Sequence, residues 1–166
     1  MMNIATALSS EEQNLYNPAY VGTILYHGIR ESQGKNAIGL HCTLPYLLAP
    51  LALSHRYSQL RPTQITTPLA GWVSDNEGSL VGFSESVSAF IDLTNSALFF
   101  LLEQGAIVLG DDGFYRVEND RLAKQPAKVN NNPEFKHGFQ SAGFFGRWFA
   151  CAASSEVIYS QLGVAP

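Results

Sequence analysis

The C-terminal stretch from Ser141 to Pro166 constrains the fold most, because its apolar residues recur at the spacing of an α-helix. These residues are Phe145, Trp148, Phe149, Ala152, Val157, Ile158 and Leu162. Small residues stand between them at Gly143, Gly146, Ala150 and Ala153, so another backbone can approach one side closely. Gly163 and Pro166 follow in the order expected of helix stop signals. The stretch predicts one long C-terminal helix.

Arg147 is the one charge in the first apolar half of this stretch. A guanidinium among aromatic residues needs a carboxylate, carbonyl groups or a ring face as its partner. Two interpretations stay open. Arg147 pins the helix to its own domain, which the residues favour, or it meets a partner protein. In the second case Arg147, Trp148 and Phe149 are candidate contact residues.

The composition indicates one globular domain over residues 1–166, with 46% hydrophobic residues. Residues 1–16 are expected to be a flexible tail or a short helix, and 118–137 a polar connecting loop. Only 14% of residues are charged, against about a quarter in typical domains. The chain therefore has a large uncharged surface, part of which we expect to be covered in an assembly.

Charge and sorting signals narrow the class of protein further. A net charge of −4 argues against a chain that binds DNA unaided. Cys42 and Cys151 stand in apolar surroundings without a CxxC spacing, so we expect buried thiols in a reducing compartment. The N-terminus has no signal-peptide pattern, and polar residues interrupt the apolar stretches before they reach membrane-spanning length. These features predict a cytoplasmic protein with no membrane contact.

Proline positions place three helices in the first half of the chain. Asn17 and Pro18 start a helix that ends within residues 31–36. Pro45 starts a second helix, capped by Thr43 and broken or kinked at Pro50. A third, short helix spans residues 68–73, is capped by Thr67, and turns Leu69 and Trp72 inward. His27 lies beside the apolar stripe of the first helix, where a satisfied or half-exposed histidine is expected.

Residues 84–117 form the clearest supersecondary unit. Ser84 to Gln104 has helical periodicity and is expected to divide into two helices at residues 92–94. Gly105 ends the second helix, and two short strands follow, at 106–109 and 114–117, joined by a turn at 110–113. This order predicts a winged-helix-like core, with the hairpin as the wing. The fold class is thus mainly α with a small β-hairpin.

The wing has the wrong charge for DNA. Asp111 and Asp112 stand at its tip, where a DNA-binding wing carries donors or positive charge. A structural or protein-binding wing is therefore the better interpretation. The mildly basic connection, with Arg121, Lys124 and Lys128, is the most plausible place for a weak nucleic-acid contact.

No catalytic, cofactor or metal motif stands out. The chain lacks GxSxG, Walker A and GxGxxG patterns. Its four histidines, His27, His41, His55 and His137, are scattered, and His41-Cys42 has no second pair at a zinc-like spacing. We therefore expect no enzyme, no cofactor and no metal site. A small hydrolase would require His41 or His55 to meet a carboxylate in a cleft.

Several motifs together resemble the middle component of bacterial ABC-three-component systems, a group that includes Lamassu-type defence systems. They are Asn17-Pro18-Ala19, Leu44-Pro45, Trp72, Gln104-Gly105 with its hairpin, Gly146-Arg147-Trp148-Phe149-Ala150, and Leu162-Gly163-Val164-Ala165-Pro166. The resemblance covers nearly the whole chain. It offers no catalytic residues to transfer, and Arg147 and Trp148 carry over only as motif positions.

The resemblance implies a small non-enzymatic adaptor. Its expected partners are an ABC ATPase of the SMC type and a variable effector, often a nuclease, with DNA contacted through the complex. Two other classes stay open from the residues: a winged helix-turn-helix DNA-binding regulator, and a small hydrolase with an unrecognised site.

Overall fold

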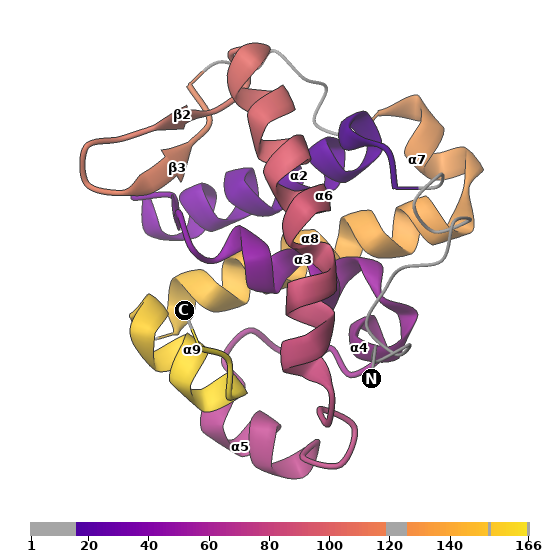
Figure 1. Cartoon of the computed structure of the whole chain (residues 1–166), viewed down its shortest axis with the longest axis vertical. Helices are drawn as coiled ribbons and strands as arrows, with labels where there is room; N and C mark the ends of the chain where they lie inside the picture. Colours follow the sequence, from indigo (N-terminus) through magenta and orange to yellow (C-terminus); the bar gives the residue numbers. More distant parts are fainter. Residues whose placement is uncertain (1–15, 119–125, 153, 166) are drawn as a thin grey trace, which may run out of the picture.

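The computed structural model describes residues 16–118, 126–152 and 154–165 (Figure 1). It is mainly α-helical with one small antiparallel sheet, in agreement with the predicted fold class. One hydrophobic core runs through the helices and includes Val21, Leu47, Leu101 and Phe145, none of which is exposed.

Helix α2, Pro18–Asn36, begins where the sequence predicts. The Asn17 side chain caps it by accepting a hydrogen bond from the Tyr20 backbone N–H at 2.9 Å, and Pro18 occupies the first helical position. The helix ends at Asn36, and its C-cap, Ala37, has a left-handed φ of 61°. The end therefore falls at the last residue of the predicted interval.

The second predicted helix begins at Pro45 as predicted, but its cap and the position of the break differ. Helix α3 spans Pro45–Leu53 with Leu44 as its N-cap, so the predicted Thr43 cap is wrong. Pro50 lies inside α3, and the chain breaks at Ser54 before the short helix α4, His55–Ser58. Proline removes only one helical hydrogen bond, and α3 is almost wholly buried, so packing maintains the helix past Pro50.

Helix α5, Leu69–Asp75, matches the short predicted helix, although Pro68 rather than Thr67 is its N-cap. Leu69 and Trp72 are buried as predicted, and the Trp72 indole donates a hydrogen bond to the Leu60 carbonyl at 2.7 Å. A turn at residues 77–82 then leads to helix α6, Phe83–Glu103.

Helix α6 is continuous, so the predicted division at residues 92–94 is wrong. The stretch contains no Pro or Gly, and Thr94 is buried inside the helix rather than capping a new one. Among the described residues, α6 is the one helix that passes a length-and-hydropathy test for a membrane span, which core helices also pass.

The predicted hairpin is confirmed as β2, Val108–Leu109, and β3, Phe114–Arg116. A third strand, β1, Leu40–His41, pairs with β3 and gives the order β1-β3-β2. No pattern in the sequence indicated β1. It is held by tertiary contacts: the Ser32 hydroxyl and the Asn36 amide of α2 both donate to the Gly39 carbonyl, at 3.1 and 3.0 Å.

The C-terminal part is not one helix. Helix α7, Ala127–Asn131, is followed by α8, Pro133–Cys151, and α9, Ser155–Leu162. The predicted polar connecting loop at 118–137 is therefore wrong from Ala127 on. Asn132 caps α8 by accepting from the Glu134 and Phe135 backbone N–H groups. Ala152 and Ser154 are extended and separate α8 from α9. Serine prefers a helix start to a helix interior, which accounts for the break.

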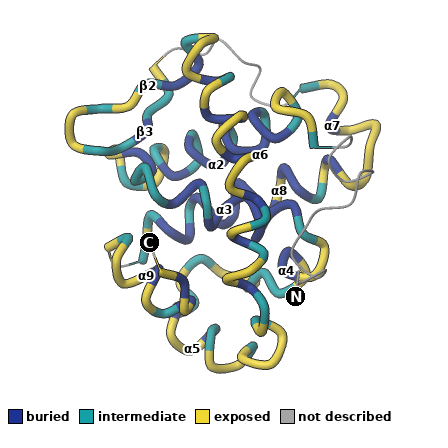
Figure 2. The backbone as a smooth tube through the Cα atoms, in the orientation of Figure 1, coloured by how far each residue is buried: buried dark blue, intermediate teal, exposed yellow. Residues whose placement is uncertain are grey.

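The helices form three layers. Helices α2 and α3 pack against both α6 and α8, whereas α6 and α8 scarcely touch. In Figure 1 helix α6 crosses in front of α2, α3 and α8. One side of α6 and one side of α8 are therefore outer surfaces on opposite sides of the molecule. Figure 2 shows the buried residues gathered along α2, α3 and α8 near the centre of the molecule.

Candidate functional site

The Gly146–Ala150 motif of α8 is divided between the core and the surface. Trp148 and Phe149 are 2% and 3% exposed. The Trp148 indole donates to the Thr67 carbonyl at 2.8 Å, and its ring meets the Trp72 ring edge-on at 5.1 Å. These two candidate contact residues are therefore core residues of this chain, and Arg147 is the member of the motif that reaches the surface.

Gly146 allows α8 and α2 to pack backbone against backbone. A Cβ atom added at Gly146 would lie 2.2 Å from the Gly28 carbonyl oxygen. This is the close approach that the run of small residues predicted. Ala153, in the same run, lies outside the described residues.

Arg147 pairs with Glu31 of α2. Its Nη1 donates to the Glu31 carboxylate at 2.6 Å, and the two side chains are 37% and 30% exposed. The interpretation favoured by the sequence, that Arg147 ties its helix to its own chain, is confirmed. The pair is half-exposed, so we expect its contribution to stability to be modest, about 1 kcal/mol or less.

His27 lies next to this pair and is neutral. Its ring stacks on Phe139 at 3.8 Å, and its Nδ1 lies 3.0 Å from Arg30 Nη2. The pKa of His27 is lowered to about 4, chiefly by burial; the Glu31 charge raises the pKa, and the charges of Arg30 and Arg147 lower it. A guanidinium has no acceptor, so Nδ1 must accept and the ring proton is on Nε2. The sequence prediction of a satisfied histidine is confirmed.

A pocket of about 450 Å³ opens beside Arg147. We call it the Arg61–Arg147 pocket; it is lined by His27, Arg61, Pro62, Thr63, Gln140, Phe144 and Arg147. The Arg61 guanidinium lies over the Phe144 ring at 5.8 Å and donates to the Ser141 hydroxyl at 3.3 Å. The sequence analysis missed Arg61, because a lone arginine in a loop gives no pattern and only the tertiary fold brings it to α8.

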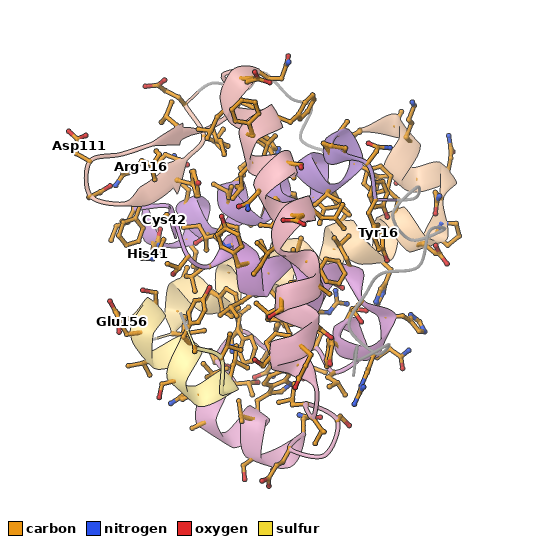
Figure 3. The ribbon with its side chains drawn as sticks, in the orientation of Figure 1. Tyr16, His41, Cys42, Asp111, Arg116 and Glu156 are labelled. Carbon is orange, nitrogen blue, oxygen red and sulfur yellow. The ribbon has the colours of Figure 1, made fainter. Side chains whose placement is uncertain are left out.

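The hairpin tip is less acidic than its sequence indicates. Asp112 is paired with Arg116 on the returning strand, and Asp111 points outward (Figure 3). The Arg116 hydrogen bond lowers the pKa of the Asp112 carboxyl. Lys128, a candidate for nucleic-acid contact, is exposed on α7, while Arg121 and Lys124 lie outside the described residues.

A second pocket, of about 350 Å³, lies between the sheet and the α8–α9 junction. His41, Asp112 and Glu156 all line it, so it does bring a histidine near carboxylates, as a hydrolase requires (Figure 3). The recorded polar contacts of the His41 ring, however, go to Thr43, with Nδ1 at 2.9 Å from its hydroxyl. Asp112 is occupied by Arg116. The described residues thus show no carboxylate that orients the imidazole as a catalytic base needs.

The remaining titratable groups form no metal site within the described ranges. No group of three or more His, Cys, Asp or Glu side chains there could hold a metal ion. Both cysteines are free; Cys42 is half-buried and Cys151 is exposed at the end of α8. The prediction that both thiols are buried is therefore wrong for Cys151.

The outer side of α6 carries apolar side chains in solvent. Phe99 is 63% exposed, and Ile91 and Leu102 are about equally exposed, at 40% and 39%. We call these three residues, with the exposed acidic residues Glu85, Asp92 and Glu103, the α6 face. The sequence indicated these apolar positions as part of a helix but not which of them face outward.

One family model matches the chain, that of ABC-three component (ABC-3C) system middle component 3, over residues 5–166. The chain belongs to this family. The match includes the motifs that carried the resemblance, from Asn17 to the C-terminal helices. No curated protein and no solved structure matches the chain significantly. As a middle component, the chain is an accessory part of a multi-subunit system.

Proposed function

We propose that this middle component is a non-enzymatic adaptor in the cytoplasm that joins an SMC-like ABC ATPase to an effector such as a nuclease. The system would be of the Lamassu type, and DNA would be contacted through the complex. Family membership supports an accessory role. The observation that carries the adaptor role is the α6 face, where three large apolar side chains project into solvent from one helix.

The geometry of α6 separates its outer apolar residues from its core residues. At about 100° per residue, Ile91, Phe99 and Leu102 fall within about 80° of one another. At the same 100° per residue, the buried residues Val87, Phe90, Leu98 and Leu101 cover an adjoining arc of about 80°. Among the described residues, the three side chains neither belong to the buried core nor pack against it. An outward apolar stripe over several turns is typical of a surface that a partner covers.

The charge beside the stripe restricts the partner. At about 100° per residue, Glu85, Asp92 and Glu103 fall within about 20° of one another and form a row next to the apolar stripe. Helix α6 has no Lys, Arg or His. A second copy of the same face would set acidic rows against each other, and an anionic membrane surface would repel them. A helix or surface with an apolar row beside basic residues fits best.

Co-purification of the tagged chain with its two neighbouring gene products tests the proposal. We expect a stoichiometric complex from the unaltered chain and loss of at least one partner from the Phe99→Ser, Leu102→Ser double variant. Val157→Ser on α9, 39% exposed, is the control and should keep the complex. Recovery of a lone folded chain in the unaltered case would overturn the adaptor role.

A winged-helix DNA-binding regulator is the alternative that the helix-then-hairpin order of α6, β2 and β3 keeps open. It requires the isolated chain to bind duplex DNA with a steep salt dependence. The Asp112–Arg116 pair occupies the one cation recorded on the described hairpin strands, which argues against this use of the wing.

A further inference from the structure

We propose that the Arg61–Arg147 pocket binds a phosphate group. The pocket lies on the outer side of α8, on the opposite side of the α2–α3 layer from the α6 face, so this inference is independent of the adaptor proposal. Two guanidinium groups from different parts of the chain line one opening of about 450 Å³. The overall charge of −4 makes such a local concentration of positive charge notable.

The pocket is rich in hydrogen-bond donors that have few partners. A guanidinium has five N–H donors, and the hydrogen bonds recorded for Arg61 and Arg147 use Nη1 of each: one to Ser141 and one to Glu31. Thr63 and Gln140 are exposed at the same opening and add a hydroxyl and an amide. The other donors of both arginines are available to an incoming anion.

His27 adds a neutral donor to the pocket wall. Because its Nδ1 accepts from Arg30, its proton is on Nε2. Nε2 lies 2.6 Å from where a Cβ atom on Gly143 would be, and Arg147 Nη1 lies 3.5 Å from the same point. The absence of a side chain at Gly143 thus lets the imidazole sit next to Arg147. In the run of small residues in α8, Gly146 is explained by the backbone contact with α2. Gly143 is explained by the side chains of His27 and Arg147 that lie against it.

The arrangement of donors favours phosphate over a carboxylate. One guanidinium satisfies a carboxylate, as Arg147 does for Glu31. A phosphate group offers three or more oxygens in different directions and is best met by donors on several sides. Arg61 enters from the loop after α4 and Arg147 from α8, with Thr63 and Gln140 also at the rim. Neither ion pair between described residues includes Arg61, so no carboxylate there neutralises its charge.

Glu31 is the competing anion within the protein. It is the one carboxylate paired with the pocket's arginines among the described residues. A bound phosphate would share or displace it at Arg147. Removal of the Glu31 charge should therefore strengthen phosphate binding, whereas removal of the Arg61 charge should weaken it. A general loss of stability would weaken phosphate binding in both variants. Opposite effects on binding would therefore come from the pocket itself.

Titration calorimetry on the full-length chain tests this, with inorganic phosphate, ATP and a short DNA duplex as three separate probes. Loss of a charge-assisted hydrogen bond should cost about tenfold in affinity for Arg61→Gln. Glu31→Gln should bind more tightly by about threefold or more. Two variants are matched controls for charge: Arg56→Gln, whose guanidinium donates to the Val81 carbonyl, and Glu103→Gln on the α6 face.

The probes distinguish the source of the phosphate. Tighter binding of ATP than of inorganic phosphate indicates a nucleotide site, and steeply salt-dependent binding of the duplex indicates the nucleic-acid backbone. Binding of no probe, or equal weakening by Arg56→Gln and Arg61→Gln, would overturn the proposal. So would selective binding of an acidic peptide, which would make the pocket a receptor for a protein carboxylate. Because Glu31→Gln must improve binding, a poorly folded Arg61 variant would not leave the question open.

Discussion

Helices α6 and α8 are similar in length, but they differ in how closely they pack and in which side chains they expose. Helix α8 packs against α2 so closely that only glycine fits at the contact, and its aromatic residues are buried. Helix α6 buries one side and leaves Ile91, Phe99 and Leu102 in solvent beside it. Its outer charges are acidic, whereas the outer surface beside α8 has Arg61 and Arg147.

The most distinctive part of the sequence, the Gly146–Ala150 motif, is not the part that presents an exposed apolar surface. The Gly146–Ala150 motif is distinctive because backbone contact and aromatic packing allow few alternatives. The α6 face has an ordinary helical sequence, and only its environment makes it unusual. Changes in α8 should therefore act on stability, and changes on the α6 face on assembly.

The largest effect is expected at the α2–α8 contact. Gly146→Ala places a Cβ atom 2.2 Å from the Gly28 carbonyl oxygen, so the two helices must separate. We expect a loss of about 3 kcal/mol or more in the free energy of unfolding. The control is Gly34→Ala in α2, where nothing lies within 4 Å of the added atom and a gain of up to about 1 kcal/mol is expected. Urea unfolding of both variants measures the difference, and equal stabilities would disprove the close contact.

The next largest effect is expected to be a pH dependence of the free energy of unfolding, caused by His27 at the α2–α8 contact. The pKa of His27 is lowered from 6.5 to about 4 in the folded chain. Between these values the unfolded chain binds a proton that the folded chain does not. The free energy of unfolding should therefore fall by about 2 kcal/mol as the pH drops through this window, and should not change from this cause above pH 6.5.

Urea unfolding at several pH values measures this slope. The groups that face His27 are Arg30, Glu31 and Arg147. His27→Gln should remove most of the slope and leave the part due to His137, whose pKa is lowered chiefly by burial. An unchanged slope in that variant would show that His27 titrates normally.

A smaller effect is expected from the Arg147–Glu31 pair, which lies at the boundary between the core and the surface of α8. A double-mutant cycle with Arg147→Ala and Glu31→Ala should give a coupling energy of about 0.5–1 kcal/mol, since both groups are about one-third exposed. A coupling energy several times larger would mean that the pair is shielded from water in solution. No coupling would mean that the ion pair does not tie α8 to α2.

The smallest effect on stability should come from the α6 face. Phe99→Ser removes a side chain that is 63% exposed, so the free energy of unfolding should change by less than about 0.5 kcal/mol. Phe90→Ser, one helix face away and 4% exposed, is the matched comparison and should cost about 3 kcal/mol or more. Thermal unfolding of the two variants measures the contrast. Similar losses would mean that Phe99 packs against the chain in solution and that the α6 face is not free for a partner.

The sequence alone determined most of the local structure, because local chemistry dictates it. Asn17 with Pro18 predicted the start of α2, and the turn at 110–113 predicted the hairpin. Periodicity predicted the buried Trp72 and Trp148. The small residues of α8 correctly predicted a close backbone contact, since few other causes require glycine in a helix.

Only the tertiary structure decided the rest, since those features depend on residues far apart in the chain. Strand β1 exists because α2 and β3 hold it. At the break between α8 and α9, the apolar periodicity favoured one continuous helix, whereas the serines favoured a new helix start. The sequence pattern alone did not decide between the two. The partner of Arg147, the position of Arg61 and the outward turn of Phe99 follow from helix packing, which fixes which side of each helix meets the core.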